Sequence, residues 1–286
     1  MMTYTAVAGL MLLSVACKKN KIIDLTVNIN GLENLGDNFV YEGWIIVDDA
    51  PITTGTFTVN DAGIMSTNTF DVNQKSLEDA TTFVLTIEPT IDPDAAPSNV
   101  HILAGDFSDD KASLTVSHSA ALGNDFTSAT GKYILATPTN GEMTNENSGV
   151  WWLDPGTGPG AGLDLPTLPA GWAYEGWAVI DGTPVSTGTF SSSNSADDSA
   201  PYSGAMEGPS FPGEDFLENA PAGLSFPTDL AGQTVVISVE PMPDNSANPF
   251  TLKPLVGAIS ESATDHTAYA MNNNAAATNP TGTVER

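Results

Sequence analysis

The chain has 286 residues, with 35 Asp and Glu against 8 Lys and Arg, a formal net charge of −27 and a pI of about 4.1. This balance excludes a nucleic-acid-binding protein, because contacts along a phosphate backbone need clustered Lys and Arg, and Arg286 is the only arginine. An apolar content of 41% is too high for a wholly disordered acidic chain, so a folded core is expected. The 26 Gly and 20 Pro favour short strands and turns over long helices.

The chain begins with an uncharged apolar segment, residues 1–16, which is too short for a permanent membrane helix of roughly 20 residues and is typical of a signal peptide. The following Leu-Ser-Val-Ala-Cys of residues 13–17 resembles the lipobox of bacterial lipoproteins, which implies lipid attachment at Cys17. The alternative is that Cys17 is an ordinary apolar residue of the signal segment. No intrachain disulfide is possible, because Cys17 is the only cysteine.

Residues 17–21 are expected to form a lipidated basic tether. Lys18, Lys19 and Lys21 would lie beside the lipid headgroups and help to hold an acylated chain on an anionic membrane. Lys18 directly after the cysteine resembles lipoproteins that are sorted to the outer membrane. The expected location is therefore extracytoplasmic, with the membrane as a partner through the N-terminal lipid.

Strand patterns follow the tether. Apolar side chains at alternate positions from Ile23 to Ile29 predict a half-buried strand. Residues 41–47 and 83–87 are apolar on both sides of the alternation, which predicts central strands buried on two faces. The Pro of Glu88-Pro89 ends the second of these, because proline cannot donate a ladder hydrogen bond.

An internal repeat organises the rest of the chain. Residues 41–57 align without a gap with 174–190, at an offset of 133 (174 − 41), and residues 83–89 align with 235–241, at an offset of 152 (240 − 88). The second copy therefore carries 19 extra residues (152 − 133) between its two matched blocks. They fall within residues 191–234, where Ser, Gly, Pro and acidic residues predict a long surface loop.

Each repeat is long enough to be a domain, and Asp48-Asp49 and Asp181-Gly182 are typical of hairpin turns. No convincing helical period is present. We therefore expect an all-β chain with two tandem antiparallel β-sandwich domains of the Ig-like or Greek-key kind, at residues 22–130 and 131–286. Strand-like segments are present at 132–137 and 150–153, and either could be the first strand of the second domain.

Four blocks recur in the same order in both repeats: Tyr-Glu-Gly-Trp, Asp-x-x-Pro, Thr-Gly-Thr-Phe and an apolar run ending in Glu-Pro. Over residues 41–105 and 163–257 this order resembles the extracytoplasmic C-terminal domain of anti-sigma-K factors. The resemblance implies a β-sandwich and an outward-facing, sensor-like module. The sequence shows neither the sigma-binding domain nor the transmembrane helix of that family, so sequestration of a sigma factor is not expected.

The sequence carries no recognisable catalytic motif. His101, His118 and His266 are not spaced with Cys or one another as a metal site requires, and no Gly-x-Ser-x-Gly segment is present. We expect surface or turn roles for them, and neither an enzyme nor a cofactor. Acidic clusters at residues 92–94, 106–110 and 197–198 match no calcium-binding loop and are interpreted as solvated surface rather than metal sites.

Two glutamates, Glu42 and Glu175, lie in strands that otherwise read as buried, so each must be paired or hydrogen-bonded. One interpretation is a partner-binding site shared with Glu88 and Glu240. The favoured alternative is a structural carboxylate satisfied by backbone donors. Among the tryptophans, the sequence favours core positions over sugar platforms for Trp44 and Trp177, and it favours a filled domain junction for Trp151, Trp152 and Trp172.

The leading hypothesis is a non-enzymatic, lipid-anchored envelope protein whose two domains bind an unknown extracytoplasmic protein or ligand, or sense a signal. The alternative is a structural or adhesive surface protein that makes its contacts through loops such as 191–234.

Overall fold

Strands dominate the computed structural model, which describes residues 21–141, 143–156 and 158–286. The predicted signal peptide and Cys17 lie outside this range. The described helices are α1 (Gln74–Asp79), α2 (Ala275–Thr278) and the single 3-10 turn η1 (Glu146–Ser148), and none has the length and apolarity needed to span a membrane. All strand pairings in the described part are antiparallel, which confirms the all-β class.

The first unit is built on one eight-stranded sheet with the order β3-β2-β5-β6-β7-β20-β1-β4. Its strands are β1 (Ile22–Asn30), β2 (Phe39–Val47), β3 (Ala50–Phe57), β4 (Thr69–Asn73), β5 (Thr82–Pro89), β6 (His101–Ser108), β7 (Lys111–Leu114) and β20 (Thr281–Glu285). The sheet curls around the core, so that its two edge strands meet through the rings of Phe57 and Phe70, whose centroids are 6.0 Å apart. The alternation predicted for β1 is confirmed, because Leu25, Val27 and Ile29 are buried.

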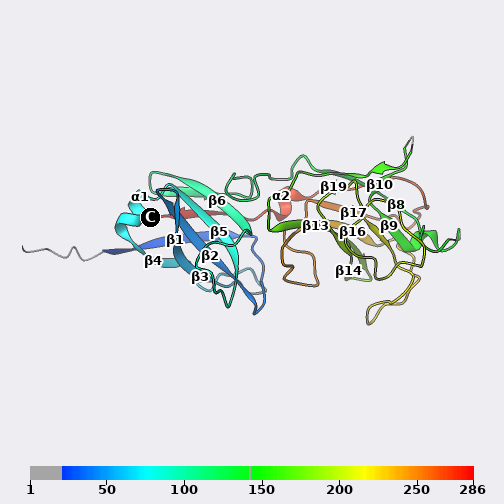
Figure 1. Ribbon diagram of the computed structural model, residues 1–286, viewed down its shortest axis with the longest axis horizontal. Coiled ribbons are helices and arrows are strands. Elements are labelled where there is room, and N and C mark those ends of the chain that lie inside the picture. The colour runs from blue at the N-terminus through cyan, green and yellow to red at the C-terminus, as the bar shows by residue number, and fades with distance from the viewer. Residues whose placement is uncertain (1–20, 142, 157) are drawn as a thin grey trace, which may run out of the picture.

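One strand of this sheet comes from the other end of the chain. β20 follows the second unit in sequence, but it lies between β1 and β7 in the first sheet, close to the end marked C in Figure 1. The expected second domain, 131–286, therefore does not hold its last residues. The reason is that β1 and β7 leave a strand-wide gap, and Val284 fills the core beneath it with no exposed surface.

The second unit contains two larger sheets and a small hairpin. The first sheet has the order β14-β13-β16-β17-β19, with β13 (Trp172–Ile180), β14 (Thr183–Phe190), β16 (Thr234–Pro241), β17 (Leu255–Ala258) and β19 (Asn272–Asn273). The second has the order β12-β8-β9-β15, with β18 also paired to β8; its strands are β8 (Thr130–Leu135), β9 (Gly149–Trp151), β12 (Leu163–Asp164), β15 (Gly213–Asp215) and β18 (Tyr269–Ala270). The hairpin joins β10 (Leu153–Asp154) to β11 (Gly160–Ala161).

The repeat in the sequence is a repeat in structure. β2–β3–β5 and β13–β14–β16 have the same pairing, and each has a register shift directly after the equivalent glycine, Gly43 or Gly176. Both hairpin turns hold two residues with positive φ: 49° and 62° at Asp48 and Asp49, and 50° and 82° at Asp181 and Gly182. Two such residues match the twist of the flanking strands, so the predicted turns are confirmed.

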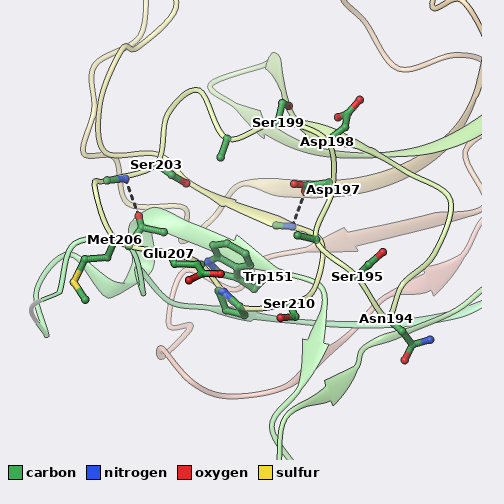
Figure 2. Close-up of a pocket in the computed structure, with 17 residues that line it drawn as sticks. Trp151, Asn194, Ser195, Asp197, Asp198, Ser199, Ser203, Met206, Glu207 and Ser210 are labelled. Atoms are coloured by element: carbon green, nitrogen blue, oxygen red, sulfur yellow. Dashed lines mark hydrogen bonds between the residues drawn. The ribbon is translucent and has the colours of Figure 1, made fainter.

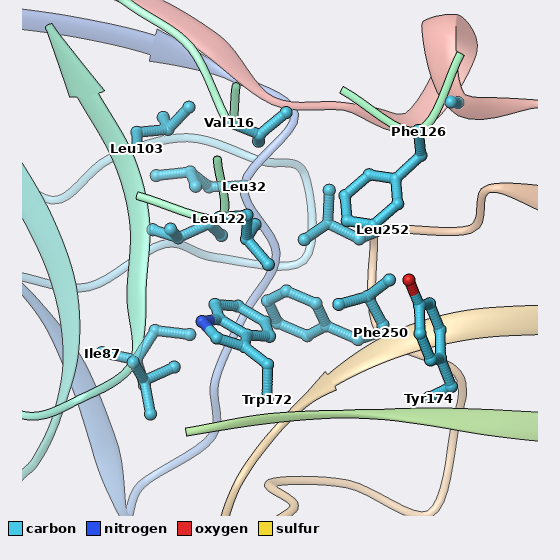
Figure 3. Packing of buried hydrophobic residues seen from close by; sticks show 14 of the residues in the cluster. Leu32, Ile87, Leu103, Val116, Leu122, Phe126, Trp172, Tyr174, Phe250 and Leu252 are labelled. Carbon is cyan, nitrogen blue, oxygen red and sulfur yellow. The ribbon is translucent and has the colours of Figure 1, made fainter. Parts of the chain in front are cut away.

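The two units lie end to end along the long axis of the molecule, with α2 at the crossing between them (Figure 1). Their main apolar cluster is continuous, and smaller clusters lie around Trp44 in the first unit and around Trp151 in the second. At the junction Trp172 of β13 packs on Phe250, with ring centroids 6.0 Å apart, and both point toward Ile87 and Leu122 of the first unit (Figure 3). The interpretation of Trp172 as a residue that fills the domain junction is thus confirmed.

Candidate functional site

The four glutamates singled out in the sequence form two separate pairs. Glu42 lies opposite Thr86 and Glu88 lies opposite Val40, which makes the two glutamates diagonal neighbours on one face of β2 and β5. Glu175 and Glu240 have the same relation on β13 and β16. The structure thus brings the glutamates together within each repeat, but it does not gather all four.

Each of these carboxylates has a local partner. The backbone N–H of Ser98 donates to Glu88, and that of Phe250 donates to Glu240, each at a distance of 2.8 Å. Side-chain hydroxyls bind the others in equivalent ways, since Thr53 donates to Glu42 and Ser186 donates to Glu175. Burial raises the pKa of Glu175 to about 7 and that of Glu240 to about 8. Equivalent partners in both repeats agree with the structural interpretation of these side chains.

The tryptophans beside the glutamates are core residues, as expected. Trp44 and Trp177 are 4% and 2% exposed, and their Nε1 atoms donate to Thr86 Oγ1 at 2.9 Å and to Ser238 Oγ at 2.8 Å. Trp152 is fully buried within the second unit, and Trp151 lies against Gly208 and Gly213. The expectation that Trp151 and Trp152 fill the domain junction is therefore wrong, because β9 and β10 pack inside the second unit.

The segment 191–234, predicted as a surface loop, is instead partly built into the fold. Its strand β15 pairs with β9, and Phe216 and Leu230 are fully buried. Asp198 also binds the edge of β14, because Thr189 donates to it through N–H at 2.8 Å and through its hydroxyl at 2.7 Å. Some of the polar side chains in this segment therefore make internal contacts.

A cavity lies within this segment. This insertion pocket, as we call it, has a volume of about 590 Å³ and is shown in Figure 2. It is lined by Thr139, Trp151, Gly213 and residues 194–200, 203–204 and 206–210. The first repeat has no counterpart, because the 19 additional residues belong to the second repeat alone.

A hydrogen-bond network fixes the wall of the insertion pocket. Asp215, which has no exposed surface, accepts bonds from Trp151 Nε1 and from the backbone N–H of Thr139, both 2.8 Å long. Thr139 Oγ1 in turn accepts from the N–H of Gly204 at 2.7 Å. These contacts hold the loop against β9, so the cavity is preformed rather than an opening between loose segments.

Trp151 needs glycine on both of its sides. A Cβ on Gly208 or on Gly213 would lie 2.6 Å from the indole ring, and Gly213 also has a φ of 151°. The close approach covers the indole, which is 4% exposed. Trp151 therefore acts as a pocket wall and is not a free stacking platform for a sugar.

Carboxyl groups without a basic partner surround the insertion pocket. Asp197 accepts a bond from the N–H of Gly213 at 2.8 Å, and burial raises its pKa to about 7. Behind the lining residue Ser203, which donates to Glu214, burial raises the pKa of Glu214 to about 8. No Lys, Arg or His lines the pocket in the described part of the chain. The site thus disfavours anionic ligands, and it offers hydroxyl and carboxyl groups to neutral or cationic ligands.

The remaining polar candidates have local contacts. Asp92 and Asp94 accept backbone N–H bonds two residues ahead, and no group of three or more His, Cys, Asp or Glu suited to a metal exists among the described residues. His101 Nδ1 lies 2.9 Å from Ala120 O, and His118 Nδ1 accepts from Ala120 N–H at 3.1 Å. His266 contacts its neighbour Asp265. His118 and His266 lie in a bend and a turn, as expected, whereas His101 is the first residue of β6.

A search of family models, of curated proteins and of solved structures finds no match to this chain.

Sequence reasoning missed the insertion pocket because a strand period is absent from the segment that forms it. One signal was present: Tyr202, Phe216 and Phe226 interrupt an otherwise polar stretch. Their rings pack together with centroids 5.5 to 6.0 Å apart. Aromatic side chains at such spacing indicate a small core of their own, which a solvated loop does not need.

Proposed function

We propose that the chain is a non-enzymatic, lipid-anchored envelope protein that binds an extracytoplasmic ligand in the insertion pocket of its second unit. The observation that carries this proposal is the asymmetry of the repeat. The sheet-face glutamates and tryptophans have the same contacts in both units, whereas the preformed cavity of about 590 Å³ exists only in the second. A site of this size, walled by apolar and convergent polar groups, is typical of small-molecule binding.

The shared core supports a sensor-like role for the module. Both units contribute to one apolar cluster. A ligand that shifts the packing of the second unit would therefore also affect the packing of the first. The likeness of the four sequence blocks to the extracytoplasmic domain of anti-sigma-K factors agrees with this role. A rigid two-unit body also suits the second candidate, a structural or adhesive surface protein in which the units are spacers.

The anchor is tested at Cys17. We expect the native chain to partition with membranes, and with outer membranes in particular, as an acylated species. The Cys17→Ser chain should be recovered without the lipid. An acylated Cys17→Ser chain that still partitions with membranes would contradict this part of the proposal.

The site is tested with a photoreactive residue at Glu207, on the exposed rim of the pocket, in cells that make the protein. The same residue at Glu261, on an exposed turn outside the pocket, is the matched control. We expect specific adducts at position 207 that disappear when Ala196→Trp fills the cavity, and that persist when Ala95→Trp places the same indole on a first-unit turn. Equal adducts at both positions would favour the adhesive role. Loss of adducts only with Glu42→Gln and Glu175→Gln would move the site to the sheet face.

A further inference from the structure

The slot between β1 and β7, which β20 fills, is a complete strand-binding site. Five register pairs join β20 to β1, from Thr26 with Glu285 to Asn30 with Thr281, and four more join it to β7. In the sheet β1 otherwise pairs only with β4, and β4 only with β1. The two edges of the slot, β1 and β7, are therefore hydrogen-bonded to each other's side of the sheet only through β20.

The contacts in the slot are specific for the sequence of β20. Lys111 Nζ lies 2.6 Å from Glu285 Oε1, and Val284 is fully buried. At the end of the strand the guanidinium of Arg286 lies 4.5 Å from the ring centre of Phe107. It also donates to the carbonyl oxygens of Leu77, Ala80 and Asp109 at 2.6, 3.0 and 2.7 Å. Val284, Glu285 and Arg286 thus each meet a matching group of the first unit.

Release of β20 exposes little apolar surface from the strand itself. Val284 is its only large apolar residue, and Thr281, Gly282, Thr283 and Glu285 are partly or fully exposed in place. The pivot is short, because α2 is held to the second unit by Thr278 and Asn274, which bind the backbone of Lys253. Only Asn279 and Pro280 separate α2 from β20.

We propose that two copies of this chain associate by exchanging β20, so that the slot of each first unit receives the strand of its partner. The contacts in trans are the same as those in cis, since every group that binds β20 belongs to the first unit and is present in each copy. Exchange is promoted when copies are crowded, as the proposed lipid anchor would crowd them on a membrane, because crowding raises the effective concentration of the second strand.

The test uses full chains with Cys17→Ser, so that only introduced cysteines react. Asn28 and Thr283 lie directly opposite each other across β1 and β20. A chain with Asn28→Cys is mixed with a chain with Thr283→Cys, incubated at high concentration and oxidised. We expect a disulfide-linked dimer in at least about tenfold excess over a mixture of Thr283→Cys with Asp71→Cys, whose exposed residue lies on β4, separated from β20 by β1.

A dimer yield equal to that of the Asp71→Cys mixture would overturn the proposal, provided that the double variant Asn28→Cys/Thr283→Cys closes its intrachain disulfide. If that disulfide does not close, sedimentation of the Cys17→Ser chain decides. A dimer that forms at high concentration and is lost with Val284→Asp supports exchange, and a monomer at every concentration up to near-millimolar contradicts it.

Discussion

At the scale of single residues, the second unit is marked by buried carboxyl groups that have hydroxyl and amide partners in place of cations. Glu240 and Glu214 have no exposed surface, and burial raises the pKa of each to about 8. Glu175 and Asp197 have pKa values raised to about 7 by the same cause. These groups bind protons more tightly in the folded chain than in the unfolded chain, where a glutamate has a pKa of about 4.3.

Stability should therefore fall as the pH rises. A raised pKa contributes stability that is full below the unfolded value of about 4.3 and is lost as the pH passes through the folded values of about 7 to 8. We expect the free energy of unfolding in urea to be lower at pH 8.5 than at pH 5 by a few kcal/mol. Glu240→Gln, which cannot ionise, should remove part of this slope, and Glu261→Gln on the exposed surface should leave it unchanged. A curve that rises from pH 5 to pH 8.5 would contradict the placement of these carboxyl groups.

At the scale of elements, the sequence predicted those parts whose signal is local. The alternation of β1, the two-sided burial of β2 and β5 and the two hairpin turns follow from side chains within a few residues of one another. β20 escaped prediction because Thr-Gly-Thr-Val-Glu has one large apolar residue and its partners, β1 and β7, lie far earlier in the chain. The insertion pocket escaped because Asp215 and Thr139 bind each other across 76 residues, a contact that composition does not reveal.

Segment 191–234 should lose its packing against Trp151 when the pairing of β15 with β9 is blocked. In Gly213→Ala the new Cβ would lie 2.6 Å from both the Trp151 ring and the Val150 carbonyl oxygen. We expect a loss of about 2–3 kcal/mol in the free energy of unfolding and a gain of solvent access at Trp151, measured by fluorescence quenching. Gly223→Ala, which has a φ of 94° but open space around its Cβ, should cost about 1 kcal/mol and leave the quenching unchanged. Equal effects of the two variants would mean that the wall is not packed against Trp151.

At the scale of the whole molecule, the repeats are two copies of one design joined into a single body. The apolar cluster is continuous through the junction, and β20 ties the far end of the chain to the first sheet. The sequence predicted the two units from the repeat. The sequence also indicated Trp172 as a junction residue, but its partners Phe250 and Ile87 could not be predicted, because they meet it only after folding.

The two units should unfold together. We expect one calorimetric transition with equal calorimetric and van't Hoff enthalpies, since the main apolar core runs through both units. Trp172→Ala should remove about 3–5 kcal/mol of stability and split the transition in two, because the indole fills the junction. Two well-separated transitions in the unaltered chain would show that the junction contributes little.

The central claim, a ligand held in the insertion pocket, is tested most directly by native mass spectrometry of the chain isolated from its own cell envelope. The account predicts a bound small molecule, neutral or cationic, that adds a defined mass to the native chain. The added mass should be present on Ala95→Trp and absent from Ala196→Trp, whose indole occupies the cavity. A chain isolated without any ligand, or a ligand that remains on Ala196→Trp, would contradict the claim.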